Sequence, residues 1–106
     1  MFQNFYLSSI IYVGAITNET MVTRKNNKEE FSNLQVEFGR ILSSTRKDKK
    51  MTQHDLEESS GISLRMISDL ERGLLQPTLA TLVKLAKGLN TTAVILMEKL
   101  QDKINR

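Results

Sequence analysis

The chain has 106 residues, a length that suits one small domain and excludes a second one of ordinary size. It contains no cysteine, which excludes disulfides and thiolate metal sites and fits a cytoplasmic protein, and its single histidine, His54, cannot form a metal cluster alone. The net charge of +3 and the pI near 9.3 are compatible with a nucleic-acid partner. Because the sequence shows no cluster of carboxylates and histidines, we expect neither an enzyme nor a cofactor site.

Residues 1–20 differ from the rest of the chain because they are largely apolar and carry no charge before Glu19. They lack the basic start of a signal peptide, and they are too short and too interrupted by polar residues for a transmembrane helix. Three interpretations stay open: an element packed on the domain or on a partner, a poorly ordered tail, or an extension caused by placing the start upstream of Met21. We predict a tail over residues 1–30 and a folded domain over residues 31–106.

The first predicted helix runs from about Ser32 to Asp48. Ser32 and Gln35 have the spacing of a capping box, in which two side chains satisfy backbone N–H groups at a helix start. Several basic residues, Lys49 among them, lie at the end of this helix. Cations at this position either stabilise the negative end of the helix dipole or contact phosphate. Apolar side chains recur at helical spacing along one side, at Leu34, Phe38, Ile41 and Leu42.

Residues 52–73 predict two short helices joined by a tight turn. The first helix starts with the capping-box pair Thr52 and Asp55 and ends at Gly61, which supplies a positive φ without strain. Ser63 then caps the second helix. Two helices and a short glycine-containing turn make a DNA-binding helix-turn-helix unit. The apolar residues that would hold these two helices together are Leu56, Ile62, Ile67 and Leu70.

Two more helices are predicted after this unit. Pro77 disfavours helix at the residue before it, and Thr78 caps a helix over about 79–88. Thr91 or Thr92 starts the last helix. Since no run after the N-terminal stretch alternates apolar and polar residues convincingly, the sequence predicts an all-α domain of five helices.

The last predicted helix, over about 92–104, is apolar nearly all round at its start. A helix that is apolar on every side has to bury every side. One side can face the domain through Ala93, Leu96, Met97 and Leu100. A second partner is then needed by Val94, Ile95 and Ile104. That partner is either another copy of the chain in a two-fold dimer or residues 1–20.

Linked motifs across about Val36 to Met97 resemble one known family. TQ-x-x-L, G-I-S, I-S-x-L-E-R-G and Q-P-T-L-x-T-L-x-K-L-A are similar to the Cro/lambda-repressor type of helix-turn-helix regulator, often called XRE-like. The resemblance implies a five-helix lambda-repressor-like fold in which helices 2 and 3 form the helix-turn-helix. It also implies a transcription regulator or repressor that binds double-stranded DNA. Small dimeric regulators of this type include restriction–modification controller proteins.

In this family the second helix of the unit, here about 63–72, reads bases in the major groove. We expect its buried face to consist of Met66, Ile67 and Leu70. The resemblance implies base contacts at the positions of Leu64, Arg65 and Asp69, with Ser63 and Ser68 beside them. Arg65 is the leading candidate because arginine matches guanine O6 and N7.

The family also uses contacts around the recognition helix. We expect phosphate contacts from Gln53, which the family uses in this way, and also from Arg46, Arg72, Lys49 and the helix start near Thr78. In similar repressors an arginine–glutamate pair, here Arg46 with Glu71, braces the first helix against the recognition helix. One departure is Glu57, which stands where the family usually has a small buried alanine, so that this side chain has to swing out or pair with a cation.

Together these features predict a homodimer that presents two recognition helices to a pseudo-palindromic operator, with half-sites about one helical turn apart. Two alternatives stay open. A DNA-binding antitoxin of a toxin–antitoxin pair would bind a second protein through the last helix or through residues 1–20. A protein-interaction module on the same fold would show little salt-dependent affinity for DNA. No membrane partner is expected.

Overall fold

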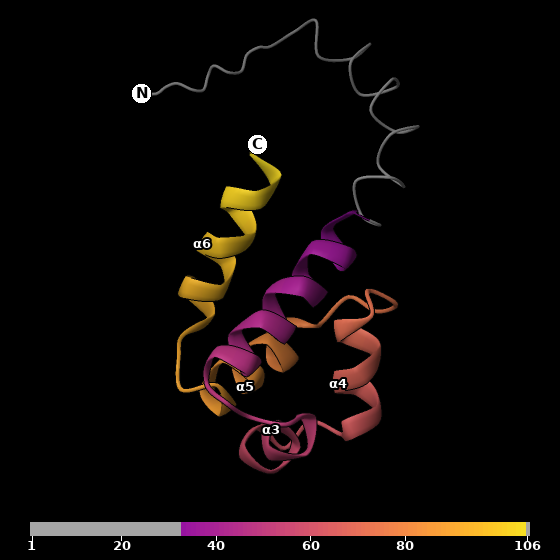
Figure 1. The fold of residues 1–106 in the computed structure, drawn as a ribbon. Helices are drawn as coiled ribbons and strands as arrows, with labels where there is room; N and C mark the ends of the chain where they lie inside the picture. Colours follow the sequence, from indigo (N-terminus) through magenta and orange to yellow (C-terminus); the bar gives the residue numbers. More distant parts are fainter. Residues whose placement is uncertain (1–32, 106) are drawn as a thin grey trace, which may run out of the picture. The chain divides into compact units, whose positions relative to one another are not determined.

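Five helices make up the part of the chain that the computed structural model describes, residues 33–105, and this range contains no strand (Figure 1). The all-α prediction is confirmed. The predicted tail over residues 1–30 and the cap at Ser32 lie outside the described residues. The helices comprise residues 33–48, α3 (Gln53–Ser60), α4 (Leu64–Glu71), α5 (Leu79–Gly88) and α6 (Ala93–Ile104).

Short-range caps set the helix boundaries. At the start of α3 the Thr52 hydroxyl accepts a hydrogen bond from the Asp55 N–H at 2.9 Å, and the Asp55 carboxylate accepts one from the Thr52 N–H at 2.8 Å. These bonds to the charged form lower the pKa of Asp55, with the Thr52 backbone N–H as the largest cause. The helix ends at Gly61, whose φ of 77° is a left-handed conformation that a residue with a Cβ adopts only with strain. The hydroxyl groups of Thr78 and Thr92 cap α5 and α6 in the same way as Thr52.

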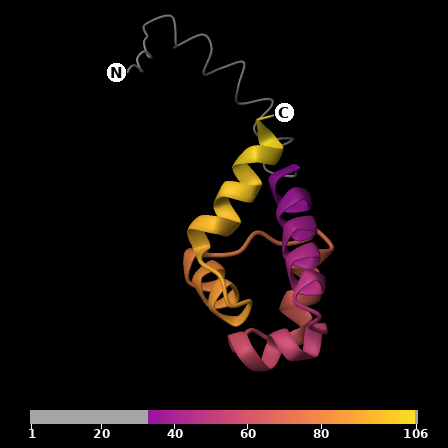
Figure 2. The same cartoon turned by 60° about the vertical axis from the view of Figure 1, so that its left-hand side comes forward.

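One apolar core joins all five helices. The helix-turn-helix unit contributes the four apolar residues predicted from the sequence, and each of them is buried. Figure 1 and Figure 2 both place α3 at the end of the fold opposite the C-terminal end of α6, and α6 runs alongside the helix of residues 33–48. The largest fully buried side chains are Leu42, Leu56, Ile67, Leu70, Leu85, Leu89 and Leu96.

The helix of residues 33–48 approaches the end of α4 at backbone distance. A Cβ added at Gly39 would lie 2.5 Å from the carbonyl oxygen of Leu70 and 2.7 Å from that of Glu71, so no larger residue fits without moving the backbone. The same close approach places the middle of this helix, around Gly39, against the end of α4. The sequence pattern gave no signal of this contact.

Two methionines differ from the sequence-based expectation. Met66 was predicted to be buried, but it is 38% exposed because Ile67 and Leu70 already occupy the core side of α4 and Met66 lies on its flank. Met97 was predicted to face the domain, and it does line a cavity beside Phe38 and Leu82, but it is still 44% exposed because Leu96 and Leu100 fill the core side of α6.

Among the described residues no single helix is long and apolar enough to cross a membrane. Only α5 and α6 counted together reach that length and composition, and the chain bends by 107° between them.

Candidate nucleic-acid interface

The two helices of the helix-turn-helix unit, α3 and α4, are joined by three residues, Gly61 to Ser63. Ile62 points from this turn into the core, and the Ser63 hydroxyl accepts a hydrogen bond from the Met66 N–H at 3.2 Å. Together these contacts fix the start of α4 relative to α3. The N-terminal half of α4 is left with an outward side that carries exposed residues.

The outward side of α4 carries most of the expected base-contacting residues. Ser63, Leu64 and Arg65 are exposed, and the Arg65 side chain is 90% accessible to solvent. Ser68 and Asp69 are partly buried. Met66, which was expected to be buried, is exposed on the same side. The residues Ser63 to Met66 together form the exposed row. An arginine that projects freely beside small hydroxyl and apolar groups can form bidentate hydrogen bonds to a base edge.

Asp69 lies between two arginines of the same surface. Its carboxylate accepts a hydrogen bond from Arg72 Nη2 at 2.8 Å and lies 3.9 Å from Arg65 Nε. The Asp69 side chain is only 20% exposed. Asp69 therefore holds Arg72 by a hydrogen bond, while Arg65 stays almost fully exposed at the outer limit of ion-pair distance. A contact between the Asp69 carboxylate and a base would require Arg72 to move.

A network behind α4 joins three elements. The Arg46 guanidinium pairs with Glu71 through both carboxylate oxygens, at 2.7 Å and 3.0 Å, and donates from Nη1 to the Met51 carbonyl oxygen at 2.7 Å. Gln53 Nε2 donates to the same Glu71 carboxylate at 2.9 Å. The pKa of Arg46 is raised above its ordinary value, chiefly because of the hydrogen bonds to Glu71, while burial acts in the opposite direction. The expected structural pair is thus present, and Gln53 belongs to it.

The expected phosphate contacts divide into two groups. Arg46 does not fit this role, because its side chain is only 10% exposed and its nitrogens face Glu71 and Met51. Gln53 is partly buried by its bond to Glu71. Of the expected phosphate contacts, Arg72, Lys49 and Thr78 are exposed.

Glu57, the departure from the family pattern, is well accommodated. Its side chain is about one-third exposed, and its Oε2 accepts a hydrogen bond from the backbone N–H of Leu64 at 3.0 Å. Its Oε1 lies 3.2 Å from His54 Nδ1. The carboxylate reaches from α3 to the start of α4, a contact that the sequence pattern did not reveal.

The helix-turn-helix family model matches residues 42–96, just over half of the chain. The chain belongs to the helix-turn-helix family. This is a family of transcriptional regulators and not of enzymes, and the resemblance to XRE-like regulators is confirmed.

Curated relatives of this helix-turn-helix protein are also named as regulators. The chain is 36% identical over 63 residues to the uncharacterized HTH-type transcriptional regulator y4dL of Sinorhizobium fredii. This match covers 59% of the chain and 32% of the relative. The chain therefore spans about one-third of the length of that relative. With the regulator y4dJ of the same organism the identity is 39% over 59 residues, which cover 56% of this chain and 77% of the relative.

Solved structures of a restriction–modification controller protein, C.Esp1396I, share the fold of this helix-turn-helix protein. The wild-type controller has a TM-score of 0.63 at 30% identity, and the match covers 69% of this chain and 96% of the controller. The controller tetramer in complex with its natural 35 base-pair operator has a TM-score of 0.64 at 30% identity over the same shares of the two chains. The five-helix, lambda-repressor-like fold is thus confirmed.

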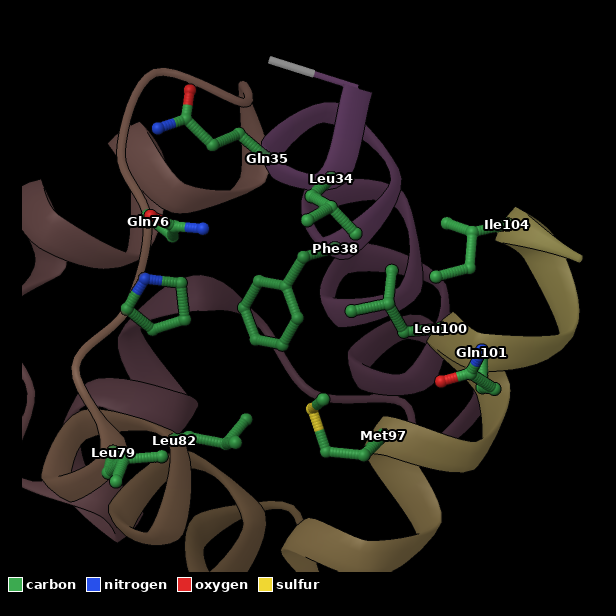
Figure 3. A pocket seen from close by; sticks show the side chains of 11 residues that line it. Leu34, Gln35, Phe38, Gln76, Leu79, Leu82, Met97, Leu100, Gln101 and Ile104 are labelled. Carbon is green, nitrogen blue, oxygen red and sulfur yellow. The ribbon is translucent and has the colours of Figure 1, made fainter. Parts of the chain in front are cut away.

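This helix-turn-helix protein has a second surface, made by apolar residues of α5 and α6. Val94 is 66% exposed and Leu79 is 83% exposed, and Ile95 and Ile104 are also exposed. Leu79 was not singled out from the sequence. A neighbouring cavity of about 340 Å³ opens between α5, α6 and the helix of residues 33–48, and the Phe38 ring points into it (Figure 3).

The described part of the helix-turn-helix protein offers no metal centre. Within residues 33–105 no three His, Asp or Glu side chains gather closely enough to hold an ion.

Proposed function

We propose that this protein binds double-stranded DNA in a sequence-specific manner as a homodimeric transcription regulator in the cytoplasm. The observation that carries the proposal is the almost fully exposed Arg65 side chain on the outer side of α4, a helix braced from behind by the Arg46–Glu71 pair. The likeness to a controller protein solved in complex with its operator supports the same function. In this arrangement α4 lies in the major groove with its N-terminal part toward the bases.

Each of the residues expected to contact bases has a role that its chemistry suits. Arg65 donates two hydrogen bonds to guanine O6 and N7, and Leu64 contacts a thymine methyl group. Ser63 and Ser68 supply hydroxyl groups beside them. Asp69 either accepts from cytosine N4 or excludes sequences that would bring a base acceptor near its carboxylate.

Phosphate contacts come from residues around α4 and fix its position on the duplex. Arg72 and Lys49 supply positive charge. The start of α5 near Thr78 supplies backbone N–H groups that favour an anion. Gln53 contacts phosphate only if its side chain leaves Glu71, so we assign it a weaker contribution.

The dimer is proposed on α6. Val94, Ile95 and Ile104 are apolar and exposed, and a second copy related by a two-fold axis would cover them. Such a dimer presents two α4 helices to half-sites about one helical turn apart, so the operator is pseudo-palindromic.

Selection of bound sequences from a random duplex pool tests this function. The purified chain should enrich two symmetric half-sites, and Arg65→Ala should lower the preference at one base position by about 1–3 kcal/mol. Arg40→Ala is the matched control, since it removes another exposed arginine that is assigned no contact with DNA. An Arg65→Ala variant with an unchanged preference would refute the assignment of Arg65.

The apolar face of α5 and α6 also favours a second candidate function, an antitoxin of a toxin–antitoxin pair whose partner protein covers this face. A small protein that purifies with the chain at fixed stoichiometry would support it. A protein-interaction module on the same fold is distinguished by DNA affinity that does not fall steeply as salt rises.

A further inference from the structure

Glu57 connects the two helices of the helix-turn-helix unit through its carboxylate. We propose that Glu57 is a positioning residue for α4 that holds the first backbone N–H of this helix and sets the charge beside it. The proposal rests on the DNA-binding function proposed above. It assigns a specificity role to a residue of α3 that does not itself belong to the exposed row on α4.

The geometry at the start of α4 supports this role. Leu64 is the first residue of α4, and its N–H is one of the donors that a helix start leaves without a partner inside the helix. Glu57 Oε2 accepts this N–H at 3.0 Å, while the Ser63 hydroxyl accepts that of Met66 at 3.2 Å. The N-terminal end of α4 is therefore held by one acceptor from its own cap and one from the preceding helix.

A carboxylate at this position also has an electrostatic effect. The first turn of α4, within Leu64–Glu71, carries no acidic residue, so Glu57 supplies the negative charge that a helix N-terminus favours. The second oxygen of Glu57 faces His54 Nδ1 at 3.2 Å, and His54 Nε2 lies 3.6 Å from the Glu58 carboxylate. Glu57 therefore places a negative charge at the start of α4, and Glu58 supplies a second one on α3, on the other side of His54.

The two effects act on different properties of binding. The hydrogen bond fixes where Leu64 and Arg65 stand, and so it favours the correct base sequence. The charge repels phosphates of every sequence alike, and so it lowers the affinity for all DNA. Specificity depends on the difference between the affinity for the correct sequence and the affinity for other sequences. Glu57 lowers the affinity for all DNA while it holds α4 in place, and so it increases the discrimination between sequences.

Two substitutions separate these effects. Glu57→Gln keeps an oxygen acceptor for the Leu64 N–H and removes the charge, whereas Glu57→Ala removes both. Glu58→Gln is the matched control, because it removes the same charge from a neighbouring carboxylate that is 70% exposed and faces His54. Each variant and the unmodified chain are measured against the duplex selected by the unmodified chain and against a random duplex of equal length.

We expect Glu57→Gln and Glu58→Gln to bind both duplexes more tightly than the unmodified chain does. The ratio of the affinity for the selected duplex to the affinity for the random duplex should stay close to that of the unmodified chain. We expect Glu57→Ala to lower this ratio by about tenfold, the size of one lost base contact. An unchanged ratio in Glu57→Ala would overturn the proposal, and so would an equal loss in Glu57→Gln and Glu57→Ala.

Amide hydrogen exchange at Leu64 tests the connection without DNA. Exchange should be slow in the unmodified chain and in Glu57→Gln, and faster in Glu57→Ala. Equal exchange in all three proteins overturns the positioning role, even if DNA is bound as proposed. If the unmodified chain shows no preference between the two duplexes, the proposed DNA-binding function is refuted. Slower exchange at Leu64 in the unmodified chain and in Glu57→Gln than in Glu57→Ala would still support the connection between α3 and α4.

Discussion

Removing Arg46 should destabilise the fold far more than removing an ordinary surface arginine. In Arg46→Ala the carboxylate of Glu71, whose side chain is 7% exposed, loses both hydrogen bonds from the guanidinium. A buried charge that loses its partner costs about 3–5 kcal/mol. For a domain of this size the thermal midpoint should then fall by at least about 12 °C. Urea and thermal unfolding followed by circular dichroism measure both quantities.

Arg40→Ala is the matched control on the same helix. Arg40 also pairs with a glutamate, Glu37, at 3.2 Å, but its side chain is 70% exposed, so its loss should cost less than about 1 kcal/mol. The double variant Arg46→Met, Glu71→Leu should recover much of the loss, because no unpaired charge remains. If Arg46→Ala costs no more than Arg40→Ala, the reasoning about burial is refuted.

Three further predictions follow from the packing, the α3 cap and the α6 surface. Gly39→Ala should lower the free energy of unfolding by about 1–3 kcal/mol in urea titrations, because its Cβ would lie 2.5 Å from the Leu70 carbonyl oxygen; an unchanged stability would contradict the close approach. The pKa of Asp55 is lower in the folded state, so its stabilising effect is present at neutral pH and is lost as the pH falls through the folded value. The difference in stability between the unmodified chain and Asp55→Ala should therefore narrow in acid, and a difference that widens would contradict this sign. Val94→Asp should convert a dimer to a monomer in sedimentation experiments while the helical content stays the same, and a dimer that persists would exclude this part of α6 from the interface.

The helix boundaries could be predicted because the signals that set them are local. Thr52, Ser63 and Thr78 each cap a helix through a hydrogen bond that spans only three residues, so their sequence positions are sufficient. For the last helix the sequence left Thr91 and Thr92 open, and the structure has Thr92 as the cap. The Arg46–Glu71 pair spans 25 residues and followed from the family resemblance rather than from spacing.

Other contacts could not be predicted because they depend on how helices meet in space. The close approach at Gly39 requires the relative position of two helices, which a periodic apolar pattern does not determine. The reach of Glu57 to the Leu64 N–H depends on a side-chain rotamer and on the angle of the turn. Met66 was expected to be buried because its residue type is apolar, although its neighbours on α4 had already filled the core.

The network of Arg46, Glu71 and Gln53 has a consequence for the entropy of binding. It fixes α4 before DNA binds, so the backbone of α4 loses little conformational freedom in the proposed complex. The ordering cost falls instead on Arg65, whose nearly free side chain gives up as much as about 2 kcal/mol of rotamer entropy when it is immobilised. This cost offsets much of the affinity gained from one base contact without reducing the discrimination between bases. A rigid helix with one adaptable arginine can thus distinguish operators while still releasing them readily.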